Sequence, residues 1–301
     1  MVTLSARQVA VADLVQEGKC SQRKACILAA VPRSTVRYKR RRALKDKSLR
    51  RKIKTLASRH QRYGYRRVAA LLRRQGTPVN VKRVHRLWKE MGLGLRQKRP
   101  KRRQYGPRGQ VLHKAEHPNH VWTYDFVEDR TQNGGRIRML CVVDEFTRQC
   151  LALEAAPRIN AHSVLQTLDW LFLVHGRPGH VRSDNGPEFI SHAVQDWLHE
   201  RGAQTLYIKP GSPWENAYIE SFNGKLRSEC LNMEIFKNVK EAQDVLDIWR
   251  KEYNEQRPHS SLNYMTPTQF AAHCCNSSRP TASLRYSNER EAPQTMVILS
   301  T

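Results

Sequence analysis

The basic residues of this 301-residue chain are concentrated in its first 110 residues, and this imbalance divides the chain into two parts. Residues 1–110 contain 33 lysines and arginines against 4 acids, whereas residues 111–301 contain 20 against 23. The excess is therefore a property of one part of the chain and not a general aid to solubility. Its natural partner is a long polyanion. An anionic membrane surface is a weaker alternative, because no basic amphipathic helix is flanked by Trp or Phe. The second part must have a different task.

Hydropathy excludes membrane-spanning and secreted proteins. Hydrophobic residues make up 39% of the chain and the mean hydropathy is −0.69, which is enough for cores but not for a span. No stretch of 18 uncharged apolar residues occurs, and the first thirty residues lack a signal-peptide core. Seven cysteines without a C-x-x-C pair indicate reduced cytosolic thiols. His113, His117 and His120 lack a facing cysteine pair, which favours loop histidines over a zinc site.

Residues 7–40 are predicted to form three short helices. The apolar spacing is helical, Ser21 can cap the second helix, and Ser34 can cap a third helix that runs through Arg37 and Arg40. A short helix, a tight turn and a basic helix form the helix-turn-helix pattern, which places its second helix in the major groove. We therefore expect Arg37 and Arg40 to contact DNA.

A similar helical unit recurs at residues 61–95. Two apolar stripes are separated by a break at Gly76-Thr77-Pro78, and Asn80 can cap the second helix. The outward positions of that helix are basic, and Lys82, Arg83 and Arg86 are the predicted DNA-binding residues. A solvated basic face has the same pattern, but the charge around both units favours DNA binding.

Residues 96–110 (RQKRPKRRQYGPRGQ) are too basic and too rich in Pro and Gly to pack. They are interpreted as a linker or as a flexible arm that follows phosphates, and both interpretations can hold together.

From about residue 117 the pattern becomes that of a mixed α/β domain. Residues 121–127 alternate, Asn133-Gly134-Gly135 is a hairpin turn, and residues 137–143 form a second strand. A third strand at 151–155 precedes alternating helices and strands: helices at 161–174, 191–201, 215–230 and 239–254, and strands at 179–182 and 205–208. Side-chain alternation favours core packing for Trp122 and Tyr124 over base stacking.

Three carboxylates in this domain indicate chemistry. Asp125 lies within an apolar strand, Asp184 follows a short strand in R-S-D-N-G-P-E-F, and Glu220 lies on a predicted helix. A carboxylate in an apolar strand is costly unless it is paired or binds a metal. Three hard oxygen ligands suit Mg²⁺ or Mn²⁺, and two such ions can support an in-line phosphoryl transfer. Each carboxylate alone is more typical of a helix cap or an ion pair, so only the three carboxylates together predict a metal site.

Several neighbouring residues carry weaker expectations. Asn216 and Asn223 flank Glu220 by about one turn each and are expected to bind DNA or the backbone. Asp144 and Glu145 stand at a strand end, where a turn role is favoured.

The spacing of the three acids and five ordered motifs resemble one known family. Asp184 and Glu220 are separated by 35 residues, and Asp125 precedes them on a hairpin meander. The motifs are W-T-Y-D-F, V-V-D-E-F-T-R, S-D-N-G-P-E-F, S-P-W-E-N-A-Y-I-E-S-F-N-G-K-L-R and Y-N-E-Q-R-P-H-S-S-L. The chain resembles the DDE integrase and transposase catalytic core, and especially the second-reading-frame transposases of bacterial insertion sequences. H-Q-R-Y-G-Y-R-R-V and the helices after it match the upstream helix-turn-helix of that group.

The resemblance implies a ribonuclease H-like α/β core, a mixed sheet with flanking helices, preceded by an all-α helix-turn-helix region. Asp125, Asp184 and Glu220 would hold two Mg²⁺ or Mn²⁺ ions. Water would cut at the ends of the element, and the exposed 3′ hydroxyl would attack target DNA. Arg227, seven residues after Glu220 where the family has a basic residue, would hold a DNA phosphate. Lys225 is the alternative, and a structural Glu220–Arg227 pair stays open.

The implied partners are DNA and further protein copies. We expect the chain to bind the terminal repeats of its element and target DNA as a homo-oligomer, in the bacterial cytoplasm and at the nucleoid, without a membrane partner. Proteins of this group are often fused to an upstream-frame product that carries a further helix-turn-helix and a zipper. No run of three heptads is present, so that product or a fusion with it is an expected partner. A DNA-binding regulator and a ribonuclease H-like nuclease are the rival functions.

We divide the chain into five regions. They are a helix-turn-helix-like basic region at 1–58, a second helix-turn-helix-like DNA-binding region at 59–96, a basic linker at 97–116, an integrase-like catalytic core at 117–274 and a loosely ordered tail at 275–301.

Overall fold

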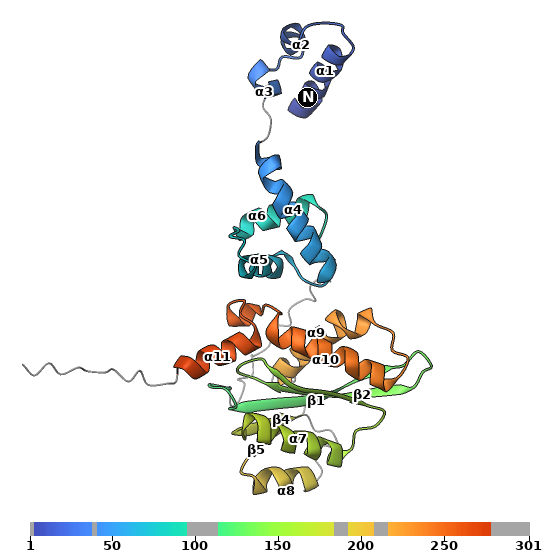
Figure 1. The fold of residues 1–301 in the computed structure, drawn as a ribbon, viewed down its shortest axis with the longest axis vertical. Coiled ribbons are helices and arrows are strands. Elements are labelled where there is room, and N and C mark those ends of the chain that lie inside the picture. Colours follow the sequence, from blue (N-terminus) through green and yellow to red (C-terminus); the bar gives the residue numbers. More distant parts are fainter. Residues whose placement is uncertain (1–2, 38–40, 95–113, 184–191, 208–215, 278–301) are drawn as a thin grey trace, which may run out of the picture. The chain divides into compact units, whose positions relative to one another are not determined.

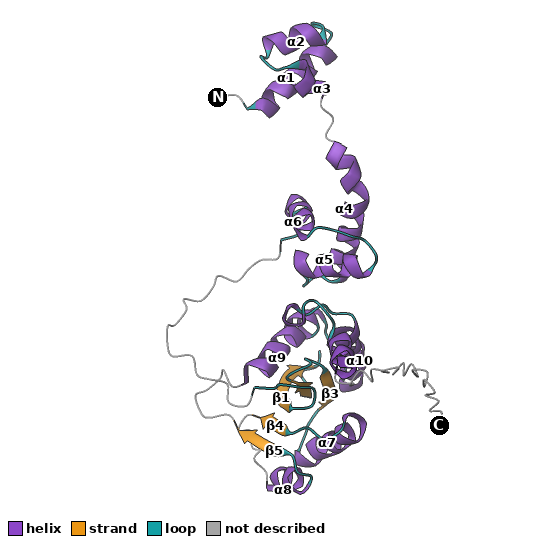
Figure 2. Cartoon of the chain, turned by 90° about the vertical axis from the view of Figure 1, so that its left-hand side faces the viewer, coloured by secondary structure: helices purple, strands orange, loops and turns teal. Residues whose placement is uncertain are grey.

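The computed structural model describes residues 3–37, 41–94, 114–183, 192–207 and 216–277. The chain forms two compact units, residues 1–95 and 96–301 (Figures 1 and 2). Within the described ranges, no helix is long and apolar enough to cross a membrane.

The first unit begins with three short helices, α1 (Leu4–Gln16), α2 (Gln22–Leu28) and α3 (Arg33–Arg37). The predicted cap of the second helix is confirmed, because Ser21 Oγ accepts the backbone N–H of Lys24 at 3.4 Å. The third helix begins one residue before Ser34, since the Pro32 carbonyl already accepts the backbone N–H of Thr35. Ser34 is therefore inside the helix, and its predicted capping role is wrong. Arg40 lies outside the described residues.

Three further helices share a second core in this unit: α4 (Arg41–Arg59), α5 (Tyr65–Arg74) and α6 (Val81–Glu90). Ile53, Val68, Leu72 and Leu87 are fully buried there. The predicted cap of α6 is confirmed, because Asn80 Oδ1 accepts the backbone N–H of Lys82 at 2.9 Å. The sequence analysis grouped residues up to 58 with the first region, whereas α4 packs with α5 and α6. The five-region division otherwise stays a prediction.

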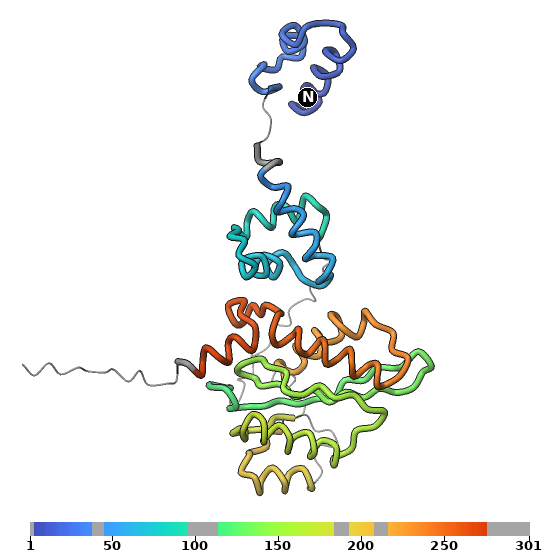
Figure 3. Tube along the Cα trace, in the orientation of Figure 1, coloured from blue at the N-terminus to red at the C-terminus, as the bar shows by residue number. Residues whose placement is uncertain are grey.

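The second unit contains a mixed five-stranded sheet in the order β3-β2-β1-β4-β5. The strands are β1 (Val121–Arg130), β2 (Arg136–Asp144), β3 (Cys150–Ala156), β4 (His180–Ser183) and β5 (Gln204–Tyr207). The first three form an antiparallel meander that Figure 3 traces, and β4 and β5 run parallel to β1. The hairpin strands and the later parallel strands predicted from the sequence are confirmed.

Helices cover both faces of this sheet. The helices α7 (Ala161–His175) and α8 (His192–Glu200) pack on one face, and α9 (Ala217–Glu229) and α10 (Val239–Glu255) pack on the other (Figure 1). Because successive side chains of a strand point to opposite faces, Trp122 and Tyr124 of β1 join the α7 and α8 core, and Val127 joins the α9 and α10 core. Core packing of Trp122 and Tyr124 is therefore confirmed. The architecture confirms the predicted ribonuclease H-like core, which follows an all-helical region in the sequence.

Two helices, α4 and α11, were not predicted. The helix α11 (Pro267–Ser277) follows two single 3₁₀ turns at Leu231–Met233 and Ser260–Leu262, and it packs against α10. Thr266 Oγ1 accepts the backbone N–H of Gln269 at 3.2 Å, and Gln269 Oε1 accepts the backbone N–H of Thr266 at 3.1 Å. This reciprocal capping box, with Pro at the first helical position, starts the helix.

Candidate active site

Asp125 lies in β1, half-buried under α9. Its Oδ2 accepts a hydrogen bond from Asn223 Nδ2 at 2.8 Å, and its Oδ1 accepts the backbone N–H of Phe126 at 2.7 Å. A carboxylate between a sheet and a helix needs such donors to offset the loss of water. Asn223, on α9, thus supports the Asp125 carboxylate and fixes its orientation.

Two side-chain hydrogen bonds tie α9 to β1. In addition to the Asn223–Asp125 bond, Thr123 Oγ1 donates to Asn216 Oδ1 at 3.2 Å, and both of these residues are buried. Thr123 and Asp125 are two residues apart and share one face of the strand, while Asn216 and Asn223 are seven residues apart and share one face of the helix. The two asparagines were expected to bind DNA or the protein backbone, but in the structure both bind side chains of β1.

On α9, Glu220 lies between the two residues that form these ties. Glu220 is four residues after Asn216 and three before Asn223, so it occupies the helix face that meets β1 between the two ties. Its side chain is exposed, and no hydrogen bond or ion pair joins it to another described residue. It also stands in the first turn of α9, where the helix dipole favours a negative charge. The Glu220 carboxylate is therefore held by its helix and accessible to a ligand.

Asp184 lies outside the described residues, together with Asn185, Gly186 and Glu188. The strand that leads to it, β4, ends at the buried Ser183. The register of the parallel β1 and β4 pairs Thr123 with Arg182. Asp125 follows Thr123 by two residues on β1, and Asp184 follows Arg182 by two residues in the sequence.

The donors near Asp125 suit a hard cation. The described site offers carboxylate oxygens from Asp125 and Glu220, which are the ligands that Mg²⁺ and Mn²⁺ prefer. Cys141 stands opposite Asp125 on β2, and burial, with Cys150 and Asp125 adding to it, raises the pKa of the Cys141 thiol well above its usual value. It therefore stays protonated and offers no thiolate to a softer ion. Among the described residues, no group of three His, Cys, Asp or Glu side chains is arranged around one point.

Two cations follow Glu220 on α9. The Arg227 side chain is exposed, and its Nη2 donates to the backbone carbonyl of Glu128 at 3.3 Å. Lys225 Nζ donates to Ser221 Oγ at 2.8 Å. Glu220 and Arg227, both described residues, do not form an ion pair with each other. Arg227 lies on the same face of α9 as Glu220, two helical turns further along.

In the first compact unit (residues 1–95), which we call the helical unit, two predicted DNA-binding residues hold a buried acid. Arg83 Nη2 lies 2.6 Å from Asp46 Oδ1, and Arg86 Nη2 lies 2.7 Å from Asp46 Oδ2. Burial alone would raise the pKa of Asp46, but the hydrogen bonds from Arg86 and Arg83 outweigh it and hold that pKa below its usual value. The Arg83 and Arg86 side chains stay 41% and 45% exposed, so they can still meet a phosphate.

The remaining helical residues are simpler. Lys82 is exposed and, with Lys45, Arg83, Arg86 and Asp46, lines a hollow of about 430 Å³. Arg37 is exposed at the end of α3, and its Nε donates to Gln22 Oε1 at 3.0 Å. DNA binding by these residues stays a prediction.

Two acids at the end of β2 differ in role. Asp144 accepts backbone N–H groups of Asn119, Phe146 and Thr147 at 2.7–3.2 Å, which confirms its turn role. Glu145 is instead buried 3.5 Å from Arg182 of β4, and the sequence analysis missed this pair. Burial raises the pKa of Glu145 to about 7, despite the nearby charges of Arg182 and Arg148.

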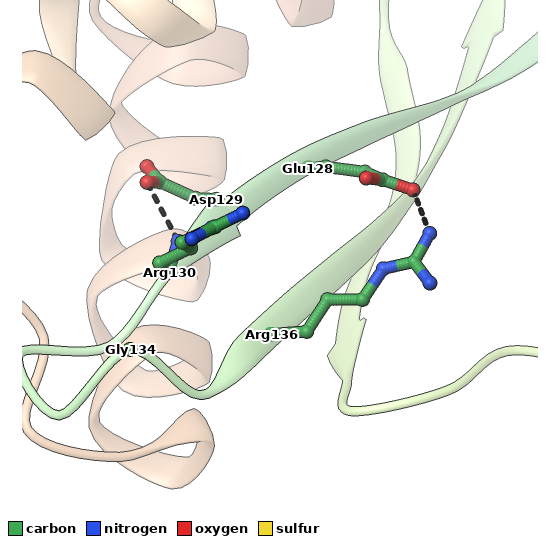
Figure 4. A pocket seen from close by; sticks show the side chains of 5 residues that line it. All are labelled: Glu128, Asp129, Arg130, Gly134 and Arg136. Atoms are coloured by element: carbon green, nitrogen blue, oxygen red, sulfur yellow. Dashed lines mark hydrogen bonds and ion pairs between the residues drawn. The ribbon is translucent and has the colours of Figure 1, made fainter.

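A hollow of about 660 Å³ lies at the closed end of the β1–β2 hairpin (Figure 4). It is lined by Glu128, Asp129, Arg130, Gly134 and Arg136. Glu128 forms an ion pair with Arg136, and Asp129 Oδ1 accepts the backbone N–H of Arg130 at 2.8 Å. Neither Asp125 nor Glu220 lines it, so it is not the candidate active site.

Solved structures with related architecture come from viral integrases. A chain of the simian T-cell lymphotropic virus intasome in complex with PP2A regulatory subunit B56 gamma superposes with a TM-score of 0.47 at 16% identity, covering 83% of this chain and 80% of that chain. The HTLV-2 integrase catalytic core domain in complex with magnesium gives 0.41 at 16% identity, covering 52% and 97%. Likenesses of this size add no weight to a family assignment.

Family profiles and relatives do assign the chain. An HTH-like domain profile matches residues 43–103, and two integrase core domain profiles match residues 115–213 and 201–267. The 31.7 kDa protein of insertion element IS407 from Burkholderia multivorans is 42% identical over 84% of this chain and 91% of its own length. The transposase for insertion sequence element IS904 from Lactococcus lactis is 32% identical over 73% and 91%. The chain therefore belongs to the insertion-sequence transposases that join a helix-turn-helix-like domain to an integrase core domain.

Proposed function

We propose that this transposase cuts DNA at the ends of its insertion sequence and joins the exposed 3′ hydroxyl to target DNA. The observation that carries the proposal is the pair of side-chain ties between α9 and β1. They hold the segment of α9 that carries Glu220 against β1, the strand that carries Asp125, and the Glu220 side chain is exposed. A surface helix that only covered the sheet would not need two polar ties, one buried and one partly buried, to hold an exposed acid in place.

Three carboxylates would hold the metal: Asp125, Asp184 and Glu220. When bound, two Mg²⁺ or Mn²⁺ ions activate an attacking oxygen and stabilise a leaving oxygen. Asn223 is a positioning residue, because its amide orients the Asp125 carboxylate at 2.8 Å. Burial raises the pKa of Cys141, opposite Asp125 on β2, and the proposed ligand set consists of carboxylate oxygens alone.

The proposed reaction has two exchanges of a phosphorus–oxygen bond. Water first attacks the phosphodiester at the end of the element and releases a 3′ hydroxyl. That hydroxyl then attacks a target phosphodiester and releases a target 3′ hydroxyl, with no covalent protein intermediate. Arg227, on the Glu220 face of α9, holds a phosphate beside the reacting one, and Lys225 serves the same strand.

The helical unit would grip the DNA. Its predicted contacts are Arg37, Arg40, Lys82, Arg83 and Arg86, and the net charge of +29 over residues 1–110 supplies the non-specific attraction to phosphates. We further propose that the chain acts as a homo-oligomer, because two element ends must be brought together. The product of the upstream reading frame, or a fusion with it, would complete end recognition in the bacterial cytoplasm.

The test uses labelled duplexes that carry the element's own ends and a target plasmid. Wild-type protein is compared with Glu220→Gln and with Glu255→Gln, an exposed acid at the end of α10, each with Mg²⁺, with Mn²⁺ and with a chelator. We expect metal-dependent joined product from wild type and Glu255→Gln, and none from Glu220→Gln.

Other outcomes separate the rival functions. Cleavage without joining would indicate a nuclease and contradict the proposal. Binding without either step, unchanged when the upstream product is added, would indicate a regulator.

A further inference from the structure

A third, smaller pocket of about 260 Å³ lies beside α9. Its floor is apolar and includes Val143, Phe222 and Tyr253. Its polar lining is formed by Arg148, Tyr218, Ser221, Lys225, His259 and Ser261, and we call it the basic pocket. Among the described residues that line it, none is acidic, and the charged ones are cations.

The basic pocket and the active site use different faces of one helix. Ala217, Tyr218, Ser221 and Lys225 lie on one side of α9, and consecutive residues of a helix are rotated by about 100°. Ser221 therefore points roughly a quarter turn away from Glu220, although the two are adjacent in the sequence. The third face of α9, with Ile219 and Phe222 among its residues, is buried in the core. The helix thus directs Glu220 and the residues of the basic pocket to different sides.

Arg148 is held in place but has unused hydrogen-bonding capacity. It lies in the turn between β2 and β3, and its guanidinium stands 3.9 Å from the centroid of the Tyr218 ring. Its Nη1 is enclosed and has no hydrogen-bond partner among the described residues. An enclosed donor without an acceptor is costly, and a guanidinium stacked on a ring keeps its edge for an incoming anion.

Lys225 and Ser221 add donors on the helix side of the pocket. Lys225 Nζ donates a hydrogen bond to Ser221 Oγ at 2.8 Å, which holds the ammonium group at the helix side of the basic pocket. Ser261 and the buried His259 approach from the segment after α10. Guanidinium, ammonium and hydroxyl groups around an apolar floor are the donors that recognise a phosphate.

We propose that the basic pocket binds a backbone phosphate of the DNA strand that passes Glu220. This assignment rests on the proposed function for its choice of DNA over another phosphate. Glu220 and Lys225 are separated by a helix rise of about 7.5 Å, and a DNA strand advances by about 3.4 Å per nucleotide. The bound phosphate is therefore roughly two nucleotides from the reacting one. The pocket would act as a clamp that sets which phosphodiester reaches Glu220.

The test measures binding, without divalent metal, to element-end duplexes in which single phosphates near the cleavage site are replaced by uncharged methylphosphonates. The proteins are the full-length wild type, Arg148→Gln, Lys225→Gln and the control Lys240→Gln, an exposed lysine in the first turn of α10. In wild type and Lys240→Gln, one replacement about two nucleotides from the cleavage site should weaken binding several-fold. Both pocket variants should bind more weakly and lose that sensitivity, and Lys225→Arg should regain it.

Three results would overturn the proposal. One is unchanged sensitivity in both pocket variants, with unfolding temperatures that match wild type. Another is a normal strand-transfer yield from the wild type with no sensitive phosphate, which would leave the proposed function standing without the clamp. The third is saturable binding of inorganic phosphate to DNA-free protein, lost in both variants, without any methylphosphonate effect. Sensitivity without strand transfer would keep the clamp and contradict the proposed function.

Discussion

The helical unit (residues 1–95) and the sheet unit (residues 96–301) each bury a carboxylate against arginine, but the pKa values of the two carboxyl groups shift in opposite directions. Asp46 takes hydrogen bonds from two partly exposed arginines, and its pKa is held below the usual value. Glu145 faces Arg182 at 3.5 Å with both side chains buried, and its pKa is raised to about 7. Hydrogen bonding makes the difference, because both arginines donate hydrogen bonds to Asp46, whereas the nearby charges of Arg182 and Arg148 alone do not offset the burial of Glu145.

The contrast extends to what the charges do. In the helical unit the acid serves stability and the cations remain available to DNA. In the sheet unit we propose that the acids at 125, 184 and 220 do the chemistry and that nearby cations position the DNA. Substitution of one acid in each unit should therefore damage different properties.

The largest effect is expected from Asp125→Asn. The substitution keeps an acceptor for the Phe126 N–H but removes the negative charge that a cation needs, so strand transfer should fall by about 10³-fold or more. Duplex binding should change little, because the helical unit is untouched. Joined product and binding are measured on the same labelled ends, with Asp247→Asn, an exposed acid on α10, as the control. Equal joining by Asp125→Asn and its control would break the contrast between the two units.

The pH dependence of unfolding comes next. Because the folded pKa of Glu145 is about 7 against an ordinary 4.5, its contribution is fully present below pH 4.5 and is lost as pH rises through 7. The loss is at most about 3 kcal/mol. Asp46 has the opposite sign, since its pKa is lowered from 3.8 and its contribution is lost only as pH falls below that value. In denaturant unfolding across pH 4 to 8, the free energy of unfolding of wild type should decrease as pH rises and Glu145 ionises, and that of Glu145→Gln should change less. Equal slopes of this free energy against pH in the two proteins would refute the assignment.

Asn223→Ala tests the positioning of Asp125. Loss of the amide leaves Asp125 less oriented, so strand transfer should fall by about 10- to 100-fold, as for other groups that support a metal ligand. Raising the concentration of Mn²⁺ should recover part of the activity, which a purely structural defect would not allow. A loss that no metal concentration alters, in a protein of unchanged stability, would count against the positioning role.

Asp46→Asn is the counterpart in the helical unit. It should lower the stability of that unit by about 1–2 kcal/mol, because the exposed arginines recover much of their hydration. DNA affinity should stay the same or rise, since Arg83 and Arg86 lose an intramolecular partner. Thermal unfolding and duplex binding are the measurements, and a loss of strand transfer like that of Asp125→Asn would show that the two acids are not different in kind.

The smallest effect is expected from Lys82→Gln. One lost phosphate contact should weaken DNA binding a few-fold and reduce the slope of log K against log salt by about 0.9. Lys19→Gln is the control, because Lys19 is already paired with Glu17 at 2.6 Å. The same slope in both variants would remove Lys82 from the DNA-binding face.

Local patterns predicted much of this fold. The caps at Ser21 and Asn80 and the hairpin strands depend on residues near one another in the sequence, and all are confirmed. The capping box at Thr266 and Gln269 was an available signal for α11 that the sequence analysis did not use.

The site residues were chosen from the sequence, but their supports were not. Asn223 was recognised only as a neighbour of Glu220, since its bond to Asp125 depends on α9 crossing β1. The Glu145–Arg182 pair depends in the same way on β4 lying beside β1. Contacts between elements far apart in the sequence follow from sheet order and register, which periodicity does not encode.

The most direct test of the account asks whether three carboxylates form one metal site. Mn²⁺ binding by calorimetry and strand transfer are measured together for wild type, Asp125→Asn, Asp184→Asn and Glu220→Gln. The account predicts that each substitution weakens Mn²⁺ binding and abolishes joining while DNA binding persists. Joining at the wild-type level by any one of the three variants would contradict it.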